Sequence, residues 1–246
     1  MFQTELLSEV FVELADTLVD DFDLIDFLTT LSDGCADLLG PAEAGVILLD
    51  PQGHLQLMAS TSEQMRLLEL FELQNDEGPC TDVIQTNNPI TNHSVRGQGS
   101  PWPRFDAAAD NLGFKWVHAF PMRVRSETIG AINVFCAYDK RLDATAIAVG
   151  RALADVASIG ILQERSLREA RFLNEQLQTA LNTRIAIEQA KGLLAERLKI
   201  DVDAAFSLLR SHARSHNRHL GELARSLMDG SYDHEEFAAV VAPGVE

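Results

Sequence analysis

Three arginines recur at every fourth position near the end of the chain, at Arg210, Arg214 and Arg218. In a helix this spacing places the three side chains on one face. A guanidinium carries a planar fork of N–H donors that can grip a phosphate or lie flat on an exposed base. No acidic residue is interleaved among the three. The pattern therefore favours a phosphate-binding surface, and the alternative is a solvated charged face.

The stretch Ile187–Leu194 supplies a second candidate surface. Its apolar positions recur at helical spacing, which directs Lys191 outward as a further cation. Gly192 costs about 1 kcal/mol relative to alanine inside a helix. A glycine kept beside a lysine indicates that a phosphate or a loop base approaches the backbone closely. The alternative is that another helix packs at Gly192.

Weaker candidates for the same surface flank these residues. Gln189 can offer its amide to a base edge, although a solvated glutamine fits equally well. Arg184 and Arg197 add positive charge nearby. These residues complete the predicted nucleic-acid-binding set: Arg184, Gln189, Lys191, Gly192, Arg210, Arg214 and Arg218.

Other reactive residue types give weaker signals. Cys80 follows a Gly-Pro turn, and a thiolate at a helix start would be favoured, so Cys80 is a candidate sensor of oxidants or nitric oxide. The alternative is a structural cysteine beneath a sheet. His212 and His216 are four residues apart but lack further ligands, so no metal site is predicted. No pair of nucleophile and base stands out, and the sequence predicts no enzyme.

A group of aromatic and imidazole side chains lies in the middle of the chain. It can line a ligand pocket or simply form the hydrophobic core, and the core interpretation is the simpler one. Its members are Trp102, Phe105, Phe114, Trp116 and His118. Nearby, Asp76 and Glu77 have no acid–base partner and are expected to cap a turn.

Charge is distributed unevenly along the chain. The formal net charge is -17, which excludes a protein that coats nucleic acid or anionic membrane over its whole surface. Residues 1–160 hold 9 basic and 24 acidic residues, whereas residues 184–225 hold 8 basic and 5 acidic ones. Such asymmetry predicts different partners for the two parts. Acid gathers again in a C-terminal tail, predicted over residues 231–246.

Targeting and redox features point to the cytoplasm. No basic start precedes an apolar run, and no uninterrupted apolar stretch approaches the ~20 residues that cross a bilayer, so no membrane association is expected. The 3 cysteines are widely separated, which disfavours a disulfide framework.

Hydrophobic periodicity predicts an α+β fold, an antiparallel sheet flanked by helices. The turn Asp50-Pro51-Gln52-Gly53 separates two strands, and Pro121 marks its strand as an edge or bulged one. The predicted helices cover residues 5–19, 23–39 and 67–73, with a short one that ends at residue 86. The predicted strands cover residues 45–50, 55–59, 117–124 and 128–137, with a brief extended piece at 89–91.

From about residue 143 the pattern turns helical for some fifty residues. Leu173, Leu177 and Leu181 approximate a heptad seam, which a single chain cannot bury along so long a helix. We therefore expect a coiled coil over residues 150–185 that joins two chains as a homodimer. The alternative is a long helix that folds back on its own sensor domain.

Residues 1–165 resemble a GAF sensor domain. The resemblance rests on the helical start, the strand pair around Asp50–Gly53, the turn Asp76–Cys80 and the strand Ile129–Phe135. It implies a pocket for an unknown small-molecule ligand, and no cofactor is identified.

Residues 171–230 are similar to an ANTAR domain, the three-helix RNA-binding output of transcription antitermination regulators. The similarity is carried by Arg184, Ile187–Leu194, Ala204–Arg210, Ala213 and Leu220–Ala224. The order of the two domains resembles that of actinobacterial GAF–ANTAR sensor-regulators. It implies a dimer that binds paired hairpins in nascent transcripts and so prevents the terminator stem from forming.

Two other functions remain open. The first is a ligand- or partner-binding sensor whose helical end only dimerises or docks on a protein; such a docking face should be apolar, whereas this one carries arginine. The second is a DNA-binding helix-turn-helix, which is disfavoured because the first helix of the output domain continues from the predicted coiled coil.

Overall fold

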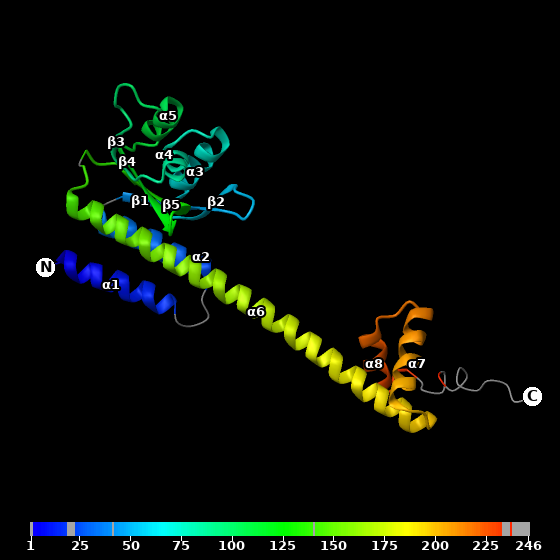
Figure 1. Cartoon of the computed structure of the whole chain (residues 1–246). Helices are drawn as coiled ribbons and strands as arrows, with labels where there is room; N and C mark the ends of the chain where they lie inside the picture. Colours follow the sequence, from blue (N-terminus) through cyan, green and yellow to red (C-terminus); the bar gives the residue numbers. More distant parts are fainter. Residues whose placement is uncertain (1, 19–22, 41, 140, 233–236, 238–246) are drawn as a thin grey trace, which may run out of the picture. The chain divides into compact units, whose positions relative to one another are not determined.

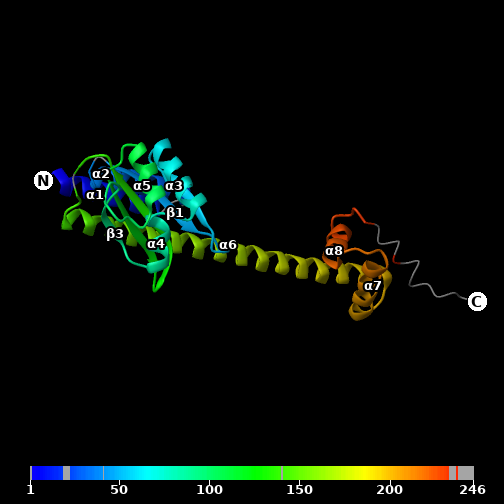
Figure 2. The same cartoon turned by 90° about the horizontal axis from the view of Figure 1, so that it is seen from above.

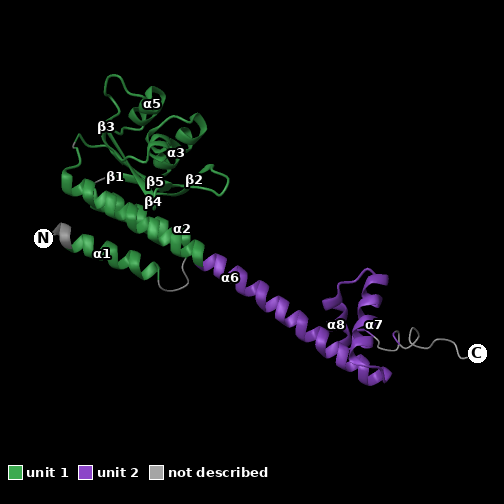
Figure 3. Ribbon diagram, in the orientation of Figure 1, with its two compact units in different colours: residues 1–166 green, residues 167–246 purple. Residues whose placement is uncertain are grey.

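The computed structural model describes residues 2–18, 23–40, 42–139, 141–232 and 237. The chain divides into two compact units, residues 1–166 and residues 167–246 (Figure 3). Most of the predicted acidic tail, residues 231–246, lies outside the described residues.

The first unit is built on a five-stranded sheet (Figure 1). The spatial order is β2-β1-β5-β4-β3, and every neighbouring pair is antiparallel. The strands are β1 (Ala42–Leu49), β2 (Leu55–Ser60), β3 (Ile90–Ser94), β4 (Trp116–Val124) and β5 (Glu127–Cys136). The predicted antiparallel sheet with flanking helices is confirmed.

The β1–β2 connection is the predicted hairpin turn. One carboxylate oxygen of Asp50 accepts hydrogen bonds from the backbone N–H groups of Gln52 and His54, both at 2.8 Å. Gly53 has a φ of 86°, in the left-handed region that glycine enters without steric cost.

The expectation that Pro121 marks an edge strand is wrong, because β4 lies between β5 and β3. The β4–β5 register does shift between Met122 and Arg123, but the extra residue is Ile129 of β5, so β4 itself is not the bulged strand. Proline is tolerated here because the described β3–β4 pairing ends at Ile90 opposite Ala119. Pro121 lies beyond that pair, so its missing N–H breaks no bond to β3.

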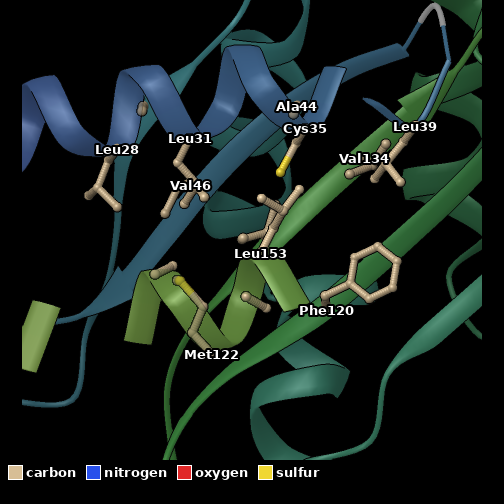
Figure 4. Packing of buried hydrophobic residues seen from close by; sticks show 14 of the residues in the cluster. Leu28, Leu31, Cys35, Leu39, Ala44, Val46, Phe120, Met122, Val134 and Leu153 are labelled. Atoms are coloured by element: carbon tan, nitrogen blue, oxygen red, sulfur yellow. The ribbon is translucent and has the colours of Figure 1, made fainter. Parts of the chain in front are cut away.

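One face of the sheet is covered by α2 (Leu24–Leu38) and the first part of α6 (Ala144–Leu198), and α1 (Phe2–Thr17) packs against α2. Asp23 caps α2 by accepting hydrogen bonds from the N–H groups of Ile25 and Asp26. The core of this face is continuous from helix to sheet (Figure 4). It includes Leu28, Leu31, Val46, Phe120, Met122 and Leu153.

The opposite face carries α3 (Glu63–Asn75), α4 (Pro79–Thr86) and α5 (Pro103–Asn111), which lie over the sheet when it is seen from above (Figure 2). Ser62 caps α3 through a hydrogen bond from the N–H of Met65. The aromatic side chains Trp102, Phe105 and Phe114 are buried beneath these helices.

Helix α6 is continuous for 55 residues and contributes to both units. Contrary to expectation, an 18-residue window of α6 has a mean hydropathy of 1.6, apolar enough to cross a bilayer. It is weak evidence for a span, because a core helix passes the same test and α6 contributes Leu153, Ala157 and Ile161 to the core of the first unit. Further along, Leu173, Leu177 and Leu181 of the predicted seam are 52–61% exposed.

Candidate nucleic-acid interface

The second unit is a three-helix domain formed by the end of α6, α7 (Val202–Ser215) and α8 (Leu220–Met228). Five of the buried residues in its core are alanines: Ala186, Ala190, Ala205, Ala213 and Ala224. Small side chains let helices approach closely. A Cβ added to Gly221 of α8 would lie 2.5 Å from the Thr183 methyl of α6, so these helices are in direct contact.

Tight turns define where the cations of this unit lie. Lys199, with a φ of 55°, follows the end of α6. Asp201 then caps α7 by accepting hydrogen bonds from the N–H groups of Asp203 and Ala204 at 2.9 and 2.8 Å. At the far end, Asn217 adopts a φ of 51°, and the chain leaves the helix. An asparagine tolerates this left-handed conformation better than most residues.

Arg210 and Arg214 are exposed on α7, one turn apart. The expectation that Arg218 shares their helical face is wrong, because α7 ends at Ser215 and Arg218 follows the Asn217 turn. The backbone N–H of Arg218 donates to the carbonyl of Ala213 at 2.8 Å. Its guanidinium carbon lies 5.0 Å from the centroid of the Tyr232 ring.

Lys191 does not point freely into solvent as expected, since its side chain is only 15% exposed. The ammonium lies 2.8 Å from a carboxylate oxygen of Glu188 and 5.4 Å from the centroid of the Phe206 ring. The ammonium itself lies over the face of the ring, which is a cation–π contact. Lys191 thus links α6 to α7 in this conformation.

The remaining predicted residues on α6 are exposed. Arg184 and Gln189 lie at the surface. Gly192 is exposed too, and no atom of the described residues lies within 4 Å of the position that a Cβ would occupy there. Within the described part of this chain, no helix packs on Gly192. Among the described residues no ion pair involves Arg184, Arg210 or Arg214.

His212 and His216 stack with ring centroids 4.0 Å apart. His212 Nε2 lies 2.6 Å from the Tyr232 hydroxyl, and His216 Nδ1 lies 3.0 Å from the carbonyl oxygen of His212. One ring nitrogen of each histidine is thus engaged in a hydrogen bond inside the domain. No cluster of three or more metal-ligating side chains occurs among the described residues.

The interior of the first unit holds an unusual pair of buried acids, Glu69 and Glu72 of α3. The amide nitrogen of Asn133 lies 2.9 and 3.0 Å from the two Glu69 oxygens. One oxygen of Glu72 accepts hydrogen bonds from the N–H groups of Cys80 and Thr81, at the start of α4. Burial raises the pKa of Glu69 to about 8, and burial together with the nearby Glu69 raises the pKa of Glu72 well above its ordinary value.

Two glycines make room for these acids. A Cβ at Gly45 would come within 2.8 Å of a Glu69 oxygen, and a Cβ at Gly78 would collide with the Glu72 carboxyl. The second Glu72 oxygen and the amide oxygen of Asn133 have no partner among the described residues. A protonated carboxyl needs fewer donors around it than a carboxylate does, because one of its oxygens carries a proton of its own.

Cys80 borders the same cluster and is fully buried. Burial, with the adjacent Glu72 and Glu69, raises the pKa of the Cys80 thiol well above its ordinary value. Its environment therefore favours the thiol over the thiolate that reacts with oxidants. Cys35 and Cys136 are also buried and unpaired.

The structure shows where the two acids expected to cap a turn and the predicted group of aromatic side chains lie. Glu77 accepts a hydrogen bond from the N–H of Arg104 at 2.7 Å and so caps α5, whereas Asp76 ends α3 in a left-handed conformation. Trp102, Phe105, Phe114, Trp116 and His118 are all buried. Burial lowers the pKa of His118 to about 4, so its imidazole is neutral at physiological pH.

Sequence reasoning did not single out Phe206, Tyr232 or the pair of buried acids. Phe206 lies on α7 within reach of Lys191, a contact between two helices that no local pattern announces. Tyr232 lies beyond α8 in a segment that reads as an acidic tail.

Comparison with known protein families also distinguishes two parts of the chain, one in each of the two compact units. Residues 23–162 match the GAF domain family, and residues 175–228 match the ANTAR domain family. A search among curated protein sequences finds no match.

Solved structures resemble the first unit in fold. The GAF domain of a phosphoenolpyruvate-protein phosphotransferase from Coxiella burnetii is 16% identical with a TM-score of 0.52, covering 68% of this chain and 96% of that one. Free methionine-R-sulfoxide reductase from Neisseria meningitidis, solved with its substrate, is 16% identical with a TM-score of 0.51, covering 65% of this chain and 91% of that one. At such identities the likeness concerns the fold alone, and it shows that this fold also serves enzymes.

Proposed function

Because the chain belongs to the GAF family and carries an ANTAR domain after it, in the order of GAF–ANTAR regulators, we propose that it is a signal-responsive regulator of transcription antitermination that binds paired RNA hairpins. The observation that carries this proposal is the ANTAR match over residues 175–228, on a unit in which the exposed Arg184, Arg210 and Arg214 have no described ion-pair partner. GAF and ANTAR domains are sensor and regulatory domains, so we propose binding rather than catalysis as the activity. We expect such a regulator to act in the cytoplasm.

The RNA interface in this proposal comprises the exposed Arg184, Gln189 and Gly192 of α6 and the exposed Arg210 and Arg214 of α7. Lys191 and Arg218 belong to it as well. Hairpin RNA is recognised by its shape, its phosphates and its loop bases. Exposed guanidinium groups suit the phosphates, and a glycine without a side chain lets a loop approach the helix backbone.

Dimerisation through α6 is part of the same proposal. Leu173, Leu177 and Leu181 are more than half exposed, although each is a large apolar side chain. A second copy of the helix can bury this seam as a parallel coiled coil. Two output units in one dimer would match two hairpins in one transcript.

In this proposal the first unit, residues 1–166, is the sensor unit, and the signal that it detects is a small molecule or a redox change. Cys80 is the candidate for the redox alternative, and its burial requires that the thiol be uncovered before an oxidant can reach it. A small-molecule signal would act through the unit's interior without this requirement.

Crosslinking the protein to RNA in cells and sequencing the bound fragments tests the proposal. We expect enrichment of transcripts that carry two neighbouring stem-loops upstream of a terminator. Recovery of no RNA above background, with a protein captured at the helical end instead, would favour a sensor whose C-terminal domain only docks on a partner.

A further inference from the structure

The second unit, residues 167–246, is called the output unit below. The chain continues past the ANTAR match at residue 228 with two aromatic residues that pack back onto this unit. Phe237 is fully buried in the core of this unit, and Tyr232 packs against the same core. Gly230, with a φ of 78°, turns the chain after α8. The N–H of Tyr232 then donates to the carbonyl of Ser226 at 2.9 Å.

The ring of Tyr232 is fixed from the side of α7. His212 Nε2 lies 2.6 Å from the Tyr232 hydroxyl, and the two rings meet edge to face with centroids 5.6 Å apart. Phe237 contacts both rings, with its centroid 4.3 Å from that of His212 and 6.1 Å from that of Tyr232. The tyrosine is therefore held by a hydrogen bond, by two ring contacts and by its own backbone.

Arg218 lies over this fixed ring. Its guanidinium carbon is 5.0 Å from the Tyr232 centroid, within the range of a cation–π contact. Its Nη2 is 3.5 Å from the Ser226 hydroxyl, at the limit of hydrogen bonding. A guanidinium stacked on a ring keeps its N–H donors in its own plane, where they can reach a phosphate.

We propose that Tyr232 is a positioning residue that holds the Arg218 guanidinium ready to grip an RNA phosphate, so that the segment beyond the ANTAR match completes the interface. This inference rests on the proposed function. Arg210 and Arg214, by contrast, have no aromatic ring within cation–π distance among the described residues. They must give up side-chain freedom on binding, whereas Arg218 is already ordered.

The test uses the full chain and a stem-loop RNA recovered by crosslinking, with affinity measured over a range of salt concentrations. Replacing Arg218 with alanine should weaken binding on the order of fivefold and lower the salt slope by about 0.7, the value of one phosphate contact on single-stranded RNA. Tyr232→Leu keeps an apolar side chain in the core but removes the ring, and should give the same two losses. Tyr232→Phe keeps the ring and should bind as the wild type does.

The double variant Y232L/R218A decides the matter, because a residue that acts only through Arg218 adds nothing once Arg218 is gone. The double variant should therefore match R218A in both affinity and salt slope. If the affinity losses of the two single variants multiplied in the double variant, the two residues would act independently and the proposal would be overturned. A Tyr232→Leu variant that binds RNA more weakly at an unchanged salt slope would overturn it as well. A wild-type chain that binds no hairpin RNA would refute the proposed function itself, and this inference with it.

Discussion

Replacing Glu69 with glutamine should make the sensor unit less sensitive to pH. Glu69 is fully buried between α3 and β5, where its carboxyl faces the amide of Asn133. Glutamine has nearly the same shape as glutamate. Its side-chain oxygen can still accept a hydrogen bond from Asn133 and its NH2 group can donate one, but it cannot ionise. The substitution therefore removes a titrating group with little change in packing.

The direction follows from the pKa of Glu69, which burial raises from 4.5 to about 8. Between these values the folded state keeps a proton that the unfolded state has lost. The stabilisation from this proton is complete below pH 4.5 and is lost as the pH rises toward 8. One proton corresponds to a slope of about 1.4 kcal/mol per pH unit, so the wild type should lose about 3 kcal/mol between pH 5.5 and pH 7.5 from this residue.

Urea unfolding followed by tryptophan fluorescence measures this slope. Both tryptophans, Trp102 and Trp116, lie in the sensor unit, so the signal reports that unit within the full chain. Glu69→Gln should match the wild type at pH 4.5 and below, and its advantage in stability should grow as the pH rises to 7.5. The matched control is Glu63→Gln on the exposed start of the same helix, which should leave the slope unchanged.

A slope in Glu69→Gln equal to that of the wild type would refute the reasoning. It would mean that Glu69 is ionised in the folded state at neutral pH, with its charge compensated by something other than a proton.

Four further predictions concern the dimer and RNA binding. Replacing Leu173 and Leu177 with aspartate should dissociate the dimer and leave the sensor unit folded. A wild-type chain that sediments as a monomer at micromolar concentration would contradict the proposed dimer. A fragment that ends at Gln163 should not bind hairpin RNA, because the first 160 residues hold 9 basic and 24 acidic residues; binding equal to that of the full chain would contradict this division. Arg214→Ala should weaken binding to cognate and scrambled hairpins alike and flatten the salt dependence by about one contact. Lys191→Ala or Gln189→Ala should instead reduce discrimination between the two hairpins, and wild-type affinity in both Lys191→Ala and Arg214→Ala would refute the placement of the site.

Much of the fold could be predicted because its signals are local. The helical period over residues 143–198 and the Asp50–Gly53 turn both act within a few residues, and the structure has α6 and the β1–β2 hairpin there. Pro121 was placed wrongly because its tolerance depends on where β3 stops pairing, some thirty residues earlier in the chain. That information is not in the neighbourhood of Pro121.

The errors at the candidate site have the same origin. Arg218 was assigned to a helical face from its spacing alone, but α7 ends at Ser215 and Asn217 takes a left-handed conformation. Glu69 and Glu72 look like solvated residues of an amphipathic helix, and only the glycines at 45 and 78 give their carboxyls room inside. Tyr232 sits beside acidic residues, and its burial depends on His212, twenty residues earlier.

The basic side chains of the output unit differ in the contacts and the side-chain entropy that they must lose when they bind RNA. Lys191 already has an ion pair with Glu188 and a cation–π contact with Phe206, each worth about 0.5–1 kcal/mol near a surface. A phosphate that drew Lys191 away would first have to replace both contacts, so its net gain there is small. Arg210 and Arg214 have no such contacts among the described residues, and they can turn toward RNA at the expense of side-chain entropy alone. This difference explains why affinity should reside mainly in the arginines, and why Lys191, held at a fixed place beside the open surface of Gly192, is the better candidate to distinguish one loop from another.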